Sequence, residues 1–125
     1  QGRDGHSSFT HGVEIGVIRS DGSYDLQRST EQLVQSFART NPQLRRQSGY
    51  SRTAIAGRQG LTTTLRNVSE TTGATEAVNL STAHLRDGSV LFIIGVAPAE
   101  EARTYFNTFG RIRQSMRIDD SGGMR

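Results

Sequence analysis

The chain has 125 residues, a formal net charge of +3 and no cysteine. All fifteen basic residues are arginine, so the chain offers no lysine for a Schiff base, a Walker-type phosphate site or a general base. The missing cysteine excludes a disulfide framework, a thiolate zinc site and a cysteine nucleophile within the chain. The arginines are spread along the sequence without forming a concentrated basic face, which argues against a nucleic-acid interface.

The first part of the chain predicts a strand followed by an amphipathic helix. Between residues 9 and 19 apolar residues alternate with others, which is the period of a strand with one buried face. Between residues 26 and 37 apolar residues recur at helical spacing, with Asp25 or Ser29 as the N-cap. Asn41-Pro42 is expected to end this helix.

The middle of the chain predicts four further strands. The first two, Tyr50–Ala56 and Leu61–Arg66, are joined through "GRQG", where the glycines fit a tight reversal. The next two, Thr75–Leu85 and Ser89–Val96, are joined at Asp87-Gly88, a pair that tolerates hairpin geometry. Both faces of the last strand are apolar, so we expect it at the centre of the sheet.

A second helix is predicted to follow Pro98, which suits a first helical turn. Glu100 and Glu101 then lie where the positive end of the helix dipole favours carboxylates. Adjacent residues on a helix point about 100° apart, so the two glutamates do not form an acid–base pair. One apolar stripe is predicted along this helix: Ala102, Tyr105, Phe106, Phe109, Ile112 and Met116.

The order of elements predicts an α+β fold: an antiparallel sheet of about five strands with two helices packed on one face. We expect residues 1–8 to be a flexible leader or the remnant of a truncated N-terminal region, residues 9–118 to form a single domain, and residues 119–125 to be a disordered tail. The longest apolar run, residues 90–97, is far shorter than the ~20 residues that span a bilayer. Direct membrane insertion by this domain is therefore not expected.

No catalytic or metal site is predicted from the residue pattern. His6 and His11 are five residues apart, a spacing that would place them on opposite sides of a strand and that breaks the i,i+4 spacing of helical metal ligands. No HExxH motif occurs. No serine lies in a GxSxG or SxxK motif. The glycines do not form a phosphate-binding loop that leads into a helix. We therefore expect no cofactor in this chain.

The best candidate for a functional surface is the polar side of the middle strands, which would be open if both helices covered the other face. Such a surface could bind a protein partner or a small anion, although a merely solvated sheet face explains the same pattern. The candidate residues are Thr62, Thr64, Arg66, Glu76, Asn79 and His84.

Several stretches resemble the C-terminal accessory region of bacterial zinc metallopeptidases similar to the CAAX-prenyl-protease type. They are "THGVEIGVIR", "LVQSFARTNPQLR", "GYSRTAIAGRQGLTTTLRN" and "LRDGSVLFIIGVAPAEEARTYFNTFGRIRQSMRI", and together they span residues 9–118. The best signatures are "GRQGL" and "LFIIGVAP". The order of elements also resembles the Mog-one/PsbP-like fold, in which helices lie on the face of a sheet.

The resemblance implies a non-catalytic accessory domain that serves partner docking, substrate docking or regulation. Zinc and the catalytic glutamate of such proteases belong to an HExxH helix in an upstream domain, so no catalytic residue carries over to this chain. The implied partners are another protein or the upstream peptidase domain, without nucleic acid. The implied location is the bacterial periplasm or the membrane-associated envelope.

Two alternatives remain open. One is a stand-alone PsbP/Mog-one-like binding protein of the envelope, which a lone signal peptide in the full gene would support. The other is a small hydrolase that uses His84 with a serine, which predicts that activity is lost on His84→Ala.

Overall fold

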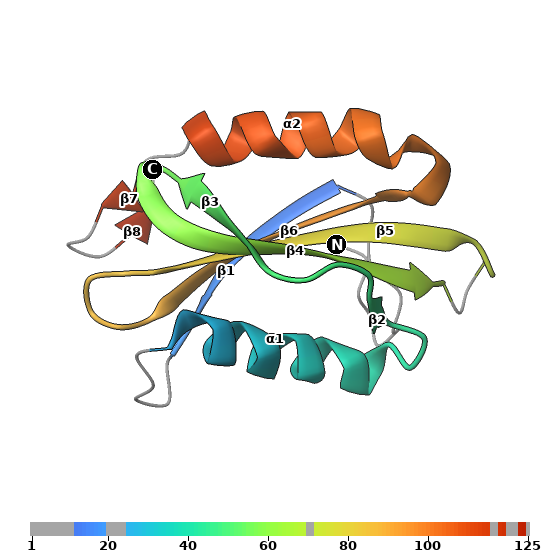
Figure 1. The fold of residues 1–125 in the computed structure, drawn as a ribbon, viewed down its shortest axis with the longest axis horizontal. Coiled ribbons are helices and arrows are strands. Elements are labelled where there is room, and N and C mark those ends of the chain that lie inside the picture. Colours follow the sequence, from blue (N-terminus) through green and yellow to red (C-terminus); the bar gives the residue numbers. More distant parts are fainter. Residues whose placement is uncertain (1–11, 20–24, 70–71, 116–117, 120–122, 125) are drawn as a thin grey trace.

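The structure is a computed structural model, and it describes residues 12–19, 25–69, 72–115, 118–119 and 123–124. Its centre is an antiparallel sheet of six strands in the order β1-β6-β5-β4-β2, with β3 also paired to β4 (Figure 1). This confirms the predicted α+β class and the antiparallel sheet. The strands are β1 (Gly12–Ile18), β2 (Arg45–Arg46), β3 (Ser51–Ile55), β4 (Arg58–Val68), β5 (Thr75–His84) and β6 (Val90–Pro98).

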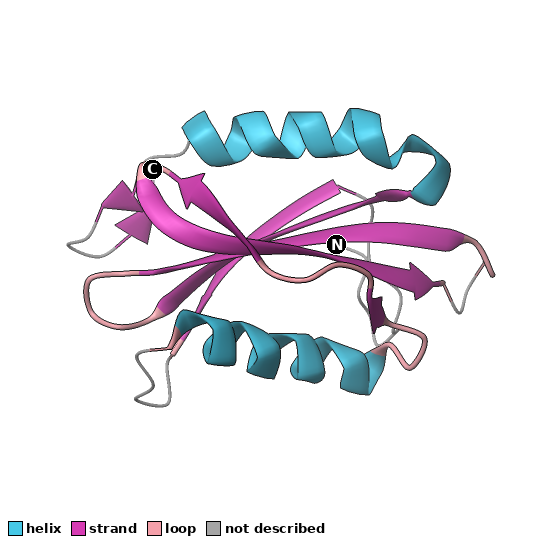
Figure 2. Ribbon diagram, viewed as in Figure 1, coloured by secondary structure: helices cyan, strands magenta, loops and turns pink. Residues whose placement is uncertain are grey.

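One helix covers each face of this sheet (Figure 2). α1 (Leu26–Thr40) packs on the face that carries Leu80 and Ile94, where its Leu33 joins the larger buried apolar cluster. α2 (Ala102–Ser115), which follows a short 3₁₀ turn η1 (Ala99–Glu101), lies on the opposite face. There Phe109 of α2 packs directly onto Gly95 of β6.

The prediction that both helices share one face is therefore wrong. The central strands explain why, because apolar residues of β6 are buried on both sides of the strand. Ile94 points to the α1 side, whereas Leu91 and Ile93 belong to a second buried cluster on the other side. The apolar surface of each face stays exposed to water, at a cost in free energy, unless another element covers it. A single helix layer cannot cover both.

α1 begins where the sequence predicts. The carboxylate of Asp25 accepts hydrogen bonds from the backbone N–H groups of Gln27 (3.0 Å) and Arg28 (3.3 Å). These contacts satisfy two donors that the first turn of a helix otherwise leaves without partners. Further along α1, the hydroxyl of Thr30 lies 2.7 Å from that of Thr82 on β5, which joins the helix to the sheet through a buried polar contact.

Asp25→Ala is expected to lower the free energy of unfolding by about 1 kcal/mol, because the two capping hydrogen bonds are lost. Chemical denaturation monitored by circular dichroism measures this change. Glu31→Ala is the matched control: it removes the same charge from the same helix, but its ion pair with Arg46 is exposed, and such pairs contribute little. A loss in Glu31→Ala equal to that in Asp25→Ala would contradict the capping role.

Three positions of the predicted disordered tail, residues 119, 123 and 124, belong to short strands. β7 (Ile118–Asp119) pairs with β8 (Gly123–Met124) in a separate two-stranded sheet. Composition rich in Asp, Ser and Gly is typical of tight turns as well as of disorder, so the sequence does not separate the two. The predicted leader, residues 1–8, lies outside the described residues. Within the described residues, no helix is long and apolar enough to cross a bilayer.

Candidate functional site

The six residues of the predicted binding surface do not share one face of the sheet. Residues directly opposite each other on paired strands lie on the same face, and Thr64 lies opposite Asn79. Glu76 and His84 occupy the alternate positions of β5 and point to the α1 side. Thr62, Thr64, Arg66 and Asn79 lie on the α2 side. The prediction combined odd- and even-numbered residues of β5 in one surface. Successive residues of a strand point to opposite faces, so these residues cannot share one.

Part of the polar face is covered by α2 and is internally hydrogen-bonded. The guanidinium of Arg113 donates to Asn79 Oδ1 at 3.0 Å, and Asn79 Nδ2 donates to Thr62 Oγ1 at 3.0 Å. The hydroxyl of Ser81 lies 3.0 Å from the same Thr62 oxygen. Burial lowers the pKa of Arg113 below its ordinary value. This network fixes the C-terminal half of α2 on a polar surface, so Thr62 and Asn79 serve packing.

Thr64 and Arg66 instead line a surface groove of about 560 Å³ where the first turn of α2 meets β4 and β5. The aromatic ring of Phe106 and the small side chains of Ala99 and Ala102 contribute apolar walls. The lining residues are Gln47, Thr64, Arg66, Thr75, Glu76, Ala77, Ala99, Glu100, Ala102 and Phe106. We refer to this set as the α2 groove.

Two opposite charges line the α2 groove without pairing. Arg66 and Glu100 are both exposed, and neither forms an ion pair or a side-chain hydrogen bond with any described residue. The helix dipole accounts for a carboxylate at Glu100, at the start of the second helix. The structure adds that Glu100 lines the same groove as Arg66. A groove with an apolar wall, one free cation and one free anion can hold an extended ligand that carries both charges.

Glu76 of β5 is buried, with 4% of its surface exposed. Although Glu76 borders the α2 groove, it offers almost no surface to a ligand there. Its carboxylate accepts a hydrogen bond from Asn67 Nδ2 at 3.0 Å across the β4–β5 pair. A buried carboxylate needs such partners because its desolvation is otherwise costly. The hydrogen bond gives Glu76 a structural role at the end of the sheet.

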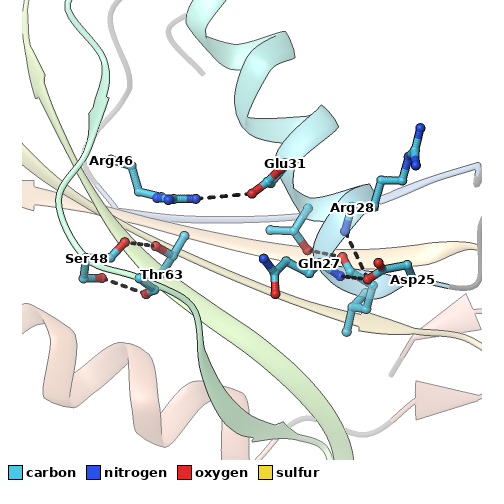
Figure 3. A network of polar contacts seen from close by, with 10 residues as sticks. Asp25, Gln27, Arg28, Glu31, Arg46, Ser48 and Thr63 are labelled. Atoms are coloured by element: carbon cyan, nitrogen blue, oxygen red, sulfur yellow. Dashed lines mark hydrogen bonds and ion pairs between the residues drawn. The ribbon is translucent and has the colours of Figure 1, made fainter.

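A second polar cluster lies beside α1 (Figure 3). The guanidinium of Arg46 lies 3.4 Å from the carboxylate of Glu31 and 4.9 Å from the centre of the Tyr50 ring. Burial raises the pKa of the Tyr50 hydroxyl, and the neighbouring Arg46 opposes this shift. Nearby, Thr63 Oγ1 donates to the backbone oxygen of Ser48 at 3.0 Å. These contacts hold the segment after α1 against the sheet, and the charges already have partners.

His84, the residue on which the hydrolase alternative rests, lies at the end of β5. Its Nε2 atom is buried and has no hydrogen-bond partner in the part of the chain that the structure describes. A serine nucleophile activated by this nitrogen would lie within hydrogen-bond distance of it. The same described residues contain no group of three or more His, Cys, Asp or Glu side chains that could hold a metal ion. His6 and His11 lie outside them.

Together the fold and the groove define an α+β module with a helix on each face of an antiparallel sheet. No protein-family model and no curated protein matches the sequence. Among solved structures, the fold is similar to that of PA94 from Pseudomonas aeruginosa, a protein of unknown function for which a regulatory role has been suggested. The TM-score is 0.64 at 9% sequence identity, over 90% of this chain and 86% of that one. Identity this low shows a shared fold alone.

Proposed function

We propose that this chain is a non-catalytic interaction domain that binds an extended peptide segment of a partner in the α2 groove. The observation that carries the proposal is that Arg66 and Glu100, which form no ion pair with a described residue, line the same groove as the aromatic ring of Phe106. The complementary ligand carries an acidic group for Arg66, a basic group for Glu100 and an apolar group for Phe106. Charge complementarity of this kind selects a partner and its orientation.

The sequence resemblance narrows this proposal further. If the chain is the accessory domain of a bacterial zinc-dependent protease of the envelope, the segment belongs to the upstream peptidase domain or to a protein that the protease handles. Zinc then belongs to that upstream domain. If it is a stand-alone envelope protein, the segment belongs to an independent partner. Reading the gene upstream of Gln1 for an HExxH domain distinguishes the two.

Selection from a random peptide library displayed on phage tests the groove. Wild-type domain is expected to enrich peptides with an acidic, an apolar and a basic residue in a fixed order. Arg66→Glu is expected to weaken the binding of these peptides about tenfold, which corresponds to about 1.4 kcal/mol. Arg103→Glu is the matched control, because Arg103 is an exposed arginine on α2 that does not line the groove.

Three outcomes would contradict the proposal. The first is that enriched peptides bind Arg66→Glu and Arg103→Glu equally, since the groove would then not hold them. The second is that the purified domain cleaves the bound peptides, as measured by mass spectrometry, because a non-catalytic domain leaves them intact. The third is that no peptide is enriched, because the groove would then not be a peptide site.

A further inference from the structure

β1 is an edge strand with an exposed apolar stripe. It pairs with β6 on one side, and no other described strand pairs with it. Three of its side chains are the large hydrophobic residues that stand out as exposed among the described residues: Val13 (37%), Ile15 (39%) and Val17 (49%). All three lie on the α2 side of the sheet, since Val13 is opposite Gly95 and Ile15 is opposite Ile93. The stripe therefore borders a backbone edge that pairs with no described strand.

This edge has few of the features that keep sheet edges from pairing. Such features are short strands, Pro, bulges and charged residues. β1 runs in unbroken register with β6 over all seven residues, and Glu14 is its one charged residue. The opposite side of the sheet differs, because β2 has two residues, both arginine, and β3 is a five-residue strand that carries Arg52. The edge formed by β2 and β3 is therefore protected from pairing, whereas the edge formed by β1 can accept another strand.

We propose that β1 pairs with β1 of a second copy of this chain, antiparallel and about a twofold axis at Ile15. Ile15 then lies opposite Ile15 of the second copy, and Val13 lies opposite its Val17. The two three-residue stripes merge into one apolar surface on the α2 side. Along the seven residues of β1, the backbone groups of every second residue, which point away from β6, gain hydrogen-bond partners on each copy. The two sheets then become one.

Charge and side-chain facing select this register. With the axis at Ile15, Glu14 lies opposite Gly16 of the second copy, so its carboxylate meets no directly opposed charge. A shift of two residues in one direction places Glu14 opposite Glu14, which is destabilising. The same shift in the other direction places Val13 opposite Arg19. Shifts of one residue turn the apolar stripe of one copy to the wrong face. The register with the axis at Ile15 therefore fits β1 of one copy to β1 of the other better than the shifted registers do.

The contact is one strand wide, so the dimer is expected to depend on concentration. Interfaces that bury less than about 1,200 Å² in total are typical of transient complexes. Sedimentation equilibrium of the intact chain is therefore expected to give a mass near 13.7 kDa in dilute solution and to rise toward twice that value as the concentration increases. A mass that stays at 13.7 kDa up to the highest soluble concentration would overturn the proposal.

Ile15→Lys places a charge on the axis and is expected to abolish the rise in mass. Ile15 is already 39% exposed, so the variant is expected to fold, and circular dichroism confirms this. Ser51→Lys puts the same charge on an exposed position of β3, at the opposite side of the sheet, and is expected to dimerise like wild type. Dimerisation of Ile15→Lys at wild-type strength would place the contact elsewhere and overturn the proposal.

Cysteine pairing tests the register, because the natural chain has no cysteine. Directly opposed residues on antiparallel strands have Cα atoms about 4.5–5.5 Å apart, within the range that a disulfide accepts. Ile15→Cys is expected to cross-link to itself on mild oxidation. Val13→Cys and Val17→Cys are expected to cross-link when mixed and not separately, since Val13 lies about 14 Å along the strand from its own copy. Self-cross-linking of Val13→Cys as fast as the mixture would overturn the register.

Discussion

Phe109→Ala is expected to lower the free energy of unfolding by about 3–5 kcal/mol, the range for removing a buried phenylalanine. The Phe109 side chain is 3% exposed and lies directly on Gly95 of β6. Its ring also packs against those of Tyr105 and Phe106, with centroids 6.2 Å and 5.7 Å away. Removing the ring leaves a cavity that α2 cannot close, because the C-terminal half of the helix is held to the sheet through Arg113.

Phe106→Ala is the matched control, three residues earlier on the same helix. Helical periodicity treats the two phenylalanines alike, but the structure leaves Phe106 half-buried, at the wall of the α2 groove. A side chain that already contacts water has less transfer free energy to lose, so its loss is expected to be clearly smaller. Urea denaturation of the two variants measures the difference. Equal losses would contradict the position assigned to Phe109.

Periodicity and turn chemistry predict most of the fold from the sequence. Alternation in β1, the apolar run of β6 and the helical stripes fix each element to within a few residues, because local burial imposes these periods. β2 was not predicted, since two arginines show no strand period. The face of the sheet on which α2 packs also could not be predicted from the apolar pattern of the helix. It depends on Leu91 and Ile93 on one side of β6 and Ile94 on the other, which is a property of the sheet.

The candidate site was only partly accessible from the sequence. Thr64 and Arg66 were predicted as surface residues and do line the α2 groove, because they lie at positions of β4 that face the α2 side of the sheet. Glu100 was correctly placed at the start of a helix, but only the folded chain brings it to the same groove as Arg66. Asn79 was expected to be open to a partner. Instead it bonds to Arg113, thirty-four residues further along the chain, and such long-range pairs leave no local pattern.

Gly60→Ala is expected to lower the free energy of unfolding by about 1–3 kcal/mol, toward the upper end of that range. A Cβ atom at Gly60 would lie 2.3 Å from the backbone oxygen of Thr82 and 3.4 Å from Cδ1 of Ile55. The oxygen belongs to the central strand β5 and cannot move without displacing its hydrogen-bonded neighbours. Overpacking against backbone therefore exceeds the gain of about 0.4–1 kcal/mol that alanine brings by restricting the unfolded chain.

Gly49→Ala is the control that separates these two effects. A Cβ atom at Gly49 would meet no other atom within 4 Å, so only the restriction of the unfolded chain remains. This variant is expected to be neutral or slightly more stable than wild type in thermal unfolding followed by circular dichroism. If Gly60→Ala also proved neutral, the strands β4 and β5 would have room for a Cβ atom at residue 60. The close contact between Gly60 and the backbone oxygen of Thr82 would then be contradicted.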